Sequence, residues 1–188
     1  PAFLQLLREK VRADAYSLTS NTWLNVLQAE GASYVGLVNN LRVSGPMYGH
    51  FGKIRETGVP QTAEIVLNPT LGNVAYDLIQ NTEVPLPLEA GPRHLRLALP
   101  GGGGRLLMLL KKPIAELRLA AAVTAHSRNG QKGHDVDIQA ELLNSEGSPV
   151  EGIVPASLTI TRPDGTRSDF SRHTALIRGK CSATFPAL

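Results

Sequence analysis

The sequence lacks the residues on which several classes of protein depend. It has one cysteine, Cys181, in 188 residues, which excludes an intrachain disulfide framework and a metal site built from several thiolates. Aromatic residues make up 5% of the chain, so few flat side chains are available for stacking on a sugar. No apolar run reaches the roughly 18 residues of a membrane-spanning helix, and the sequence therefore predicts no membrane span.

Dense positive charge is also missing. The formal net charge is +3, from 19 Lys and Arg against 16 Asp and Glu, and no basic cluster is denser than Lys111-Lys112. A nucleic-acid-binding surface normally shows a basic patch or stripe. We therefore expect no nucleic-acid partner and interpret the excess charge as a contribution to solubility.

The common catalytic and nucleotide-binding motifs are absent too. Residues 45–58 hold Gly45, Gly49, Gly52 and Lys53, but their spacing does not match the phosphate-binding loop G-x-x-x-x-G-K-[ST]. The sequence contains neither G-x-G-x-x-G nor the G-x-S-x-G nucleophile elbow. We therefore expect no enzyme activity, catalytic residue, cofactor or metal, and interpret residues 45–58 as a long loop between two strands.

Alternating hydrophobicity is the clearest feature that the sequence does have. Val136, Ile138, Ala140 and Leu142 alternate with polar residues, and a similar alternation follows over residues 154–161. This period of two is typical of half-buried strands. Apolar or alternating runs bounded by Gly, Pro and Asn predict further strands at 15–18, 23–27, 33–39, 61–67, 74–78, 94–99, 105–110, 114–125, 173–177 and 180–185.

Two β units and one helix follow from this pattern. Phe3, Leu4, Leu7 and Val11 recur at helical spacing, which predicts a short helix over residues 1–12. It either docks on the following sheet or ends a preceding domain. Pro113 marks the boundary between a first β-sandwich, residues 13–112, and a second, residues 113–188, and Gly101–Gly104 is expected to close a hairpin.

The second unit resembles a known family in its turns. The run Leu142–Gly152, LLNSEGSPVEG, and the later Pro163-Asp164-Gly165 resemble the immunoglobulin-like and macroglobulin-like sandwich domains of large bacterial surface and secreted proteins. The resemblance covers about the last third of the chain and concerns turn residues. It therefore indicates the fold more than the function. Because a complete immunoglobulin-type sandwich has about 100 residues, it implies that this unit lacks its last strands.

The first unit is similar to a different set of modules. Val35–Asn39, Val74–Leu78 and the glycine-rich run Leu97–Leu107 resemble, in this order, segments of β-sandwich modules that follow catalytic domains in some bacterial glycoside hydrolases. Such modules pack against the enzyme. The resemblance implies neighbouring domains of the same polypeptide as partners and an extracellular or periplasmic location.

Four residues are the candidates for binding. Trp23 is the only tryptophan; we interpret it as a core residue, with a sugar-stacking platform as the alternative. Tyr48, His50 and Phe51 lie in the 45–58 loop, and loops often carry binding function.

Other groups of polar residues fit ordinary surface positions better than sites. Asp135 and Asp137 share a strand face, which suits a solvated surface better than a glycosidase cleft. Three histidines lack metal-ligand spacing, and two aspartates near a turn lack a calcium-loop pattern. We expect Cys181 to be a buried, inert thiol. The histidines are His126, His134 and His173, and the two aspartates are Asp164 and Asp169.

The hypothesis that best fits these observations is a non-catalytic accessory or structural region of a larger exported bacterial protein, associated with a carbohydrate-active enzyme. The alternative is a carbohydrate- or protein-binding module that uses the 45–58 loop or Trp23.

Overall fold

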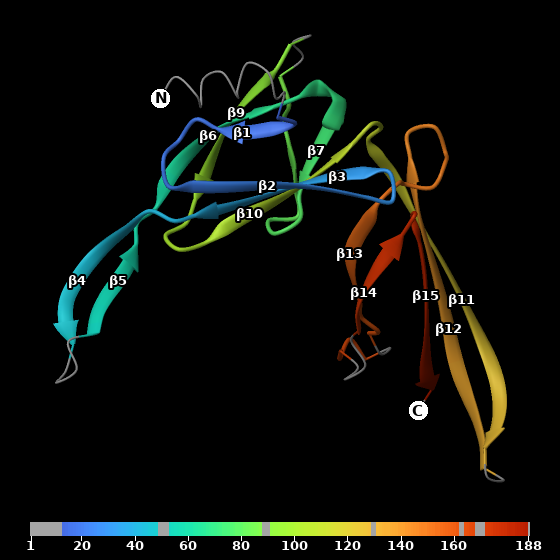
Figure 1. Ribbon diagram of the computed structural model, residues 1–188. Helices are drawn as coiled ribbons and strands as arrows, with labels where there is room; N and C mark the ends of the chain where they lie inside the picture. The colour runs from blue at the N-terminus through green and yellow to red at the C-terminus, as the bar shows by residue number, and fades with distance from the viewer. Residues whose placement is uncertain are drawn as a thin grey trace. The chain divides into compact units, whose positions relative to one another are not determined.

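The computed structural model describes residues 13–48, 53–87, 91–128, 131–161, 164–167 and 172–187. The described chain is mainly β, and its strands pair antiparallel in several sheets (Figure 1). The helix predicted for residues 1–12 lies outside the described residues. The chain divides into two compact units, which are described separately: unit 1 is Pro1–Gln28 with Ala32–Lys111, and unit 2 is Ala29–Gly31 with Lys112–Leu188.

Two sheets form most of unit 1. The smaller sheet has the order β1-β6-β9 and the larger has the order β2-β3-β10-β7-β8. The strands of the smaller sheet are β1 (Ala15–Ser17), β6 (Gln61–Leu67) and β9 (Arg93–Leu99). Those of the larger sheet are β2 (Thr22–Ala29), β3 (Ala32–Asn39), β7 (Val74–Asp77), β8 (Thr82–Val84) and β10 (Gly104–Leu110).

The core of unit 1 lies between these sheets. Every second residue of β6 and β9 points inward, as the period of two dictates, and meets apolar side chains from the larger sheet. Figure 1 shows the two sheets as layers, so unit 1 has the packing of a β-sandwich. The buried cluster consists of Val35, Leu37, Ala63, Ile65, Leu67, Leu71, Ala75, Val84, Leu95, Leu97, Leu99, Leu107 and Leu109.

The described parts of residues 45–58 belong to two strands instead of the long loop that the sequence suggested. β4 (Arg42–Tyr48) and β5 (Lys53–Gly58) pair as a two-stranded sheet with a register shift between Ser44 and Met47. The glycines and Pro46 misled the interpretation, because glycine is depleted in strands and proline is usually confined to strand edges or bulges. The Val59 N–H donates to the Leu41 carbonyl at 2.9 Å and closes the base of this hairpin.

The glycine run also differs from its prediction. Gly101–Gly104 was expected to close a hairpin, but β9 pairs with β6 in one sheet and β10 pairs with β3 and β7 in the other. The run therefore carries the chain between the two layers. Close packing accounts for its composition: a Cβ built on Gly101 would lie 2.3 Å from the Gly58 carbonyl oxygen, and one on Gly104 would lie 2.1 Å from that of Leu37.

The described part of unit 2 contains a five-stranded sheet with the order β11-β12-β15-β14-β13. Its strands are β11 (Ile114–Arg128), β12 (Gln131–Asn144), β13 (Ile153–Leu158), β14 (Arg172–Ile177) and β15 (Lys180–Ala187). The sequence predicted a second sandwich, and the structure shows this only in part, because all strands described in this unit belong to one sheet. Its buried apolar residues are Ala140, Leu142, Leu143, Val150, Leu176 and Phe185.

The register places apolar and polar residues of unit 2 on opposite faces. Opposite residues in an antiparallel pair share a face, and Leu119, Ala140 and Cys181 are aligned across β11, β12 and β15. The alternate positions Arg118, Glu141 and Lys180 are aligned on the other face. In the part of the chain that the structure describes, no helix is long and apolar enough to cross a membrane.

Candidate functional site

The structure places Trp23 and Tyr48, two of the four candidate binding residues, on different elements. Trp23 lies on β2 of the sandwich, whereas Tyr48 is the last residue of β4, at the end of the hairpin opposite its base. The side chain of Tyr48 is not described, and His50 and Phe51 lie outside the described residues. Among the four, Trp23 alone can be assessed as a side chain.

The interpretation of Trp23 as a core residue is wrong. Its side chain is 63% exposed, because β2 turns Leu24 and Val26 toward the core and the neighbouring positions point the opposite way. Apolar residues occupy both faces of this strand, so alternation alone did not indicate which face is inside.

Trp23 belongs to an exposed apolar patch on the outer face of the larger sheet. Leu27, on the same face of β2, is 62% exposed, and Val38, on the outer face of the adjacent strand β3, is 47% exposed. We call Trp23, Leu27 and Val38 the β2–β3 patch. An exposed group of large apolar side chains favours contact with a partner surface.

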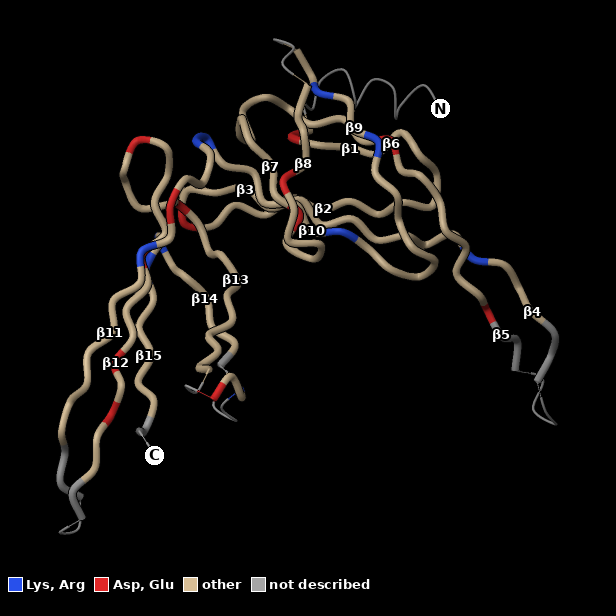
Figure 2. The backbone as a smooth tube through the Cα atoms, turned by 180° about the vertical axis from the view of Figure 1, so that it is seen from behind, with Lys and Arg blue, Asp and Glu red and all other residues tan. Residues whose placement is uncertain are grey.

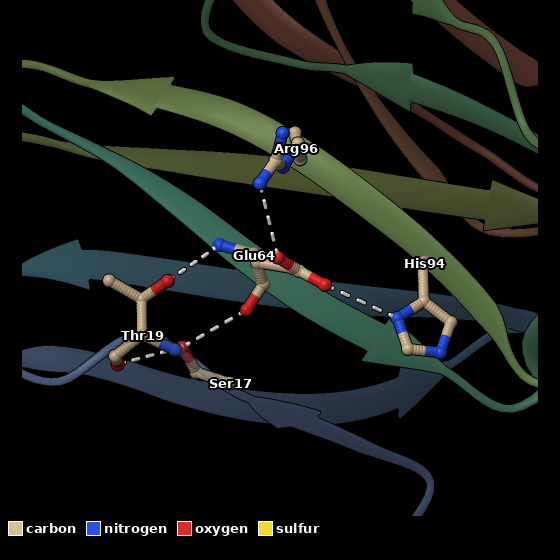
Figure 3. Close-up of polar contacts among 5 residues, drawn as sticks. All are labelled: Ser17, Thr19, Glu64, His94 and Arg96. Carbon is tan, nitrogen blue, oxygen red and sulfur yellow. Dashed lines mark hydrogen bonds and ion pairs between the residues drawn. The ribbon is translucent and has the colours of Figure 1, made fainter.

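A second cluster lies on the outer face of the smaller sheet, around Glu64 of β6. One carboxylate oxygen of Glu64 lies 3.5 Å from Nδ1 of His94, and the other lies 3.6 Å from a guanidinium nitrogen of Arg96 (Figure 3). Glu64 and Arg96 are direct partners in the β6–β9 register. Cross-strand pairs of opposite charge are a common stabilising feature of sheets.

The hydroxyl groups beside this cluster are bonded to the backbone. Thr19 Oγ1 accepts the Glu64 N–H at 2.7 Å, and Ser17 Oγ accepts the Thr19 N–H at 3.1 Å and lies 3.1 Å from the Thr19 carbonyl oxygen (Figure 3). A serine nucleophile requires a base within hydrogen-bond reach of its hydroxyl. Ser17 is turned toward backbone groups instead of His94, so the cluster holds β1 beside β6.

The most enclosed uncharged polar side chain described in unit 1 is Asn39, at the end of β3. It is 1% exposed, and its amide nitrogen donates to the carbonyls of Val59 at 2.8 Å and Pro100 at 2.9 Å. Its oxygen accepts the Leu41 N–H and the Gln61 side-chain amide, both at 2.9 Å. One side chain thus joins the hairpin base, the start of β6 and the loop between the sheets.

A buried ion pair joins β7 and β10 of the larger sheet. The Asp77 side chain is fully buried, and its carboxylate contacts Nε of Arg105, whose side chain is 9% exposed. The second carboxylate oxygen accepts the backbone N–H groups of Ile79 and Gln80, each at 2.8 Å. Such satisfied charges are costly to break, because the remaining partner would be left buried and unpaired.

Basic groups in unit 1 also line a groove of about 570 Å³, formed by residues 82–87, 94–97 and Arg105. His94 and Arg96 are paired with Glu64, and Arg105 is paired with Asp77. Arg96 and Arg105 of the groove are therefore each matched by an acid of the same framework.

A larger groove of about 840 Å³ crosses β11, β12 and β15 in unit 2. Two nitrogens of Arg118 donate to the Glu116 carboxylate at 2.9 Å each, and Lys180 lies 3.3 Å from Glu141. The hydrogen bond from Arg118 lowers the pKa of Glu116, and the Glu116 carboxylate in turn raises the pKa of Arg118. Acids and bases alternate here, so the groove carries little net charge.

Asp137 lies on the polar face of unit 2, and its carboxylate is held by two hydroxyls. Thr184 Oγ1 donates to it at 2.6 Å and Thr124 Oγ1 donates at 2.9 Å. These two hydrogen bonds lower the pKa of Asp137, with the contribution of Thr184 being the larger.

The remaining candidate residues form no common site within the described residues. Asp164 is bonded to Thr166, which lowers the pKa of Asp164, and Asp169 lies outside the described residues. No group of three His, Cys, Asp or Glu side chains in the described part is placed to hold a metal ion. Cys181 is half-buried instead of fully buried. Acidic and basic residues are interspersed along the described strands (Figure 2).

Comparison with known proteins found no match. No protein-family model, no curated protein and no solved structure matches the chain.

Proposed function

We propose that this chain is a non-catalytic, immunoglobulin-like β-sandwich region of a larger exported bacterial protein, where it supports a neighbouring carbohydrate-active domain. The observation that carries the proposal is the environment of Asn39. The full hydrogen-bonding capacity of a buried amide is used to join three separate segments of unit 1. A side chain that is hydrogen-bonded in this way stabilises the fold, and Asp77 and Glu64 do the same.

The larger protein and its location are supported by the sequence. The turn residues of Leu142–Gly152 and the order of segments in the first unit resemble modules of secreted bacterial proteins and of glycoside hydrolases. In such a protein the chain would be extracellular or periplasmic, and its partners would be domains of the same polypeptide.

The first test is the reading frame on both sides of the chain. The proposal expects an export signal and a catalytic carbohydrate-active domain in the same frame. A frame that encodes neither contradicts it.

The second test measures the support itself. The encoded protein is prepared as wild type, with Asn39→Ala, and with Asn25→Ala, which changes an exposed asparagine of β2. We expect Asn39→Ala to lower the thermal stability of the neighbouring domain while kcat and KM at low temperature stay unchanged. Equal behaviour of all three proteins would contradict a supporting role.

A second candidate function is favoured by the exposure of Trp23: binding of a carbohydrate or a protein through the β2–β3 patch. Because Trp23 is the only tryptophan, its fluorescence reports directly on this surface. An indole ring that stacks on a ligand or becomes buried is no longer exposed to water. Binding would therefore shift the tryptophan fluorescence emission to shorter wavelength. The measurement is a titration with a panel of oligosaccharides and with the neighbouring domain, with Trp23→Phe as control. An unchanged spectrum throughout would exclude this function.

A further inference from the structure

β11 of unit 2 lies at one edge of its sheet. It is the first strand in the order β11-β12-β15-β14-β13, and among the described strands it pairs with β12 alone. With 15 residues, it is also a long strand. A sheet edge of this kind exposes a row of backbone N–H and carbonyl groups that can pair with another strand.

Between Ala115 and Ala125, the side chains of β11 are exposed on both faces. All residues from Ala115 to Ala125 are exposed, and the large apolar ones occupy alternate positions on one face. Leu117, Leu119 and Val123 are 54%, 63% and 68% exposed. This face continues the one that holds Phe185 and Ala140 in the same sheet, so an added strand would extend an existing apolar surface.

The features that usually protect an edge are confined to the first residues of β11. Pro113 precedes the strand, and a register shift interrupts it between Ile114 and Glu116. Proline, bulges and charged side chains are the usual means of preventing edge pairing. Beyond Arg118 the strand has no charged residue up to Ala125, so residues 119–125 lack these protections.

When residues 116–124 pair antiparallel with the same residues of a second copy, no charged side chain faces another charged side chain. When Ala120 faces Ala120 of the copy, Arg118 faces Ala122 and Glu116 faces Thr124. The apolar residues also match, because Leu117 then faces Val123. A register centred on residue 116 or 118 would instead oppose two like charges, which is destabilising.

We propose that β11 is the interface strand of a homodimer, in which two copies pair antiparallel about Ala120 and form one continuous sheet. A two-fold axis makes this contact isologous, the commonest arrangement in soluble oligomers. The inference is independent of the function proposed above.

The first experiment is sedimentation velocity of the chain over a range of concentrations. We expect a monomer–dimer equilibrium that Leu119→Lys weakens at least tenfold. The matched control is Ile79→Lys in unit 1, since Ile79 and Leu119 are 60% and 63% exposed. A chain that stays monomeric throughout, or a dimer that the control weakens equally, would overturn the inference.

The second experiment tests the register through the sign of a charge. Ala122→Glu would place an acid opposite Arg118 of the copy, while Ala122→Lys would place a base there. We expect the glutamate variant to dimerise more tightly and the lysine variant more weakly, by roughly threefold or more. Within one chain Ala122 lies opposite Asp137, which favours lysine, so an intrachain effect has the opposite sign.

Hydrogen exchange then locates the contact. Dimer formation should slow the exchange of those amides in residues 116–124 whose N–H groups point away from β12, and leave the outer strand β13 unchanged. A dimer whose β11 amides exchange as in the monomer would contradict pairing through this edge.

Discussion

At the position of Asn39, a fully enclosed side chain holds together segments that are far apart in the sequence. Its partners Val59 and Pro100 are 20 and 61 residues away. No local motif signals such a role, and the sequence shows only an asparagine after an apolar run. The hydrogen bonds depend on three loops arriving at one point, which is why sequence reasoning missed this residue.

We predict that Asn39→Ala lowers the free energy of unfolding of unit 1 by about 2–4 kcal/mol, because buried carbonyl groups lose their donors and receive no water in exchange. Urea unfolding of the chain measures the change. The control Asn25→Ala alters an exposed side chain and should stay within about 0.5 kcal/mol of wild type. Equal effects of the two substitutions would show that Asn39 has no special role.

Asp137 gives a prediction about pH. Hydrogen bonds from Thr184 and Thr124 hold its pKa below the ordinary value of 3.8. A lowered pKa in the folded state means that the ionised carboxylate stabilises the fold above pH 3.8 and that this contribution is lost as the pH falls through the folded pKa. Thr184→Val should therefore raise the pKa of Asp137 toward 3.8.

The measurement is an NMR titration of the Asp137 carboxyl carbon. Thr124→Val should raise its pKa by a smaller amount than Thr184→Val, since the Thr184 hydrogen bond contributes more. Asp164 serves as an internal control, because its pKa is lowered by its own partner Thr166. A larger shift from Thr124→Val would reverse the order that the structure gives.

Among the elements, strands with a single apolar face or a continuous apolar run were the easiest to predict. Residues 61–67 were predicted as a strand and form β6 with the same bounds, and residues 105–110 fall within β10. The β4–β5 hairpin was missed because its glycines and proline are typical of loops. β8, with three residues, is too short to show a period.

Gly104 illustrates how an element depends on a close contact. We predict that Gly104→Ala destabilises unit 1 by about 1–3 kcal/mol, because its Cβ would lie 2.1 Å from the Leu37 carbonyl oxygen in the neighbouring strand. Thermal unfolding gives the difference. At Gly91 an added Cβ meets nothing within 4 Å, so Gly91→Ala should change the midpoint little. If Gly104→Ala left the stability unchanged, β10 and β3 would be able to move apart without a loss of stability.

For the whole molecule, the structure assigns the buried apolar side chains to two units. Leu107 is fully buried in unit 1, and Phe185 is 1% exposed in unit 2. Pro113 predicted a boundary because proline ends strand pairing; in the structure unit 1 ends at Lys111 and unit 2 continues from Lys112.

We predict that truncating each core residue destabilises its own unit. Leu107→Ala should cost about 2–5 kcal/mol and Phe185→Ala about 3–5 kcal/mol. Hydrogen exchange, followed by mass spectrometry, should show faster exchange in β3, β6 and β10 for the first variant and in β12 and β15 for the second. Acceleration spread evenly over both units in either variant would argue against two separate cores.

The sequence by itself determined where most strands lie, because the period of two is a local property that neighbouring residues carry. It also identified Trp23 as a residue of interest, but not the face that it occupies. The tertiary structure decided which strands are partners: β9 and β10 are neighbours in sequence yet belong to different sheets. Pairing, the burial of Asn39 and the exposure of Trp23 all depend on contacts between distant segments, and alternation within one strand does not specify its partner.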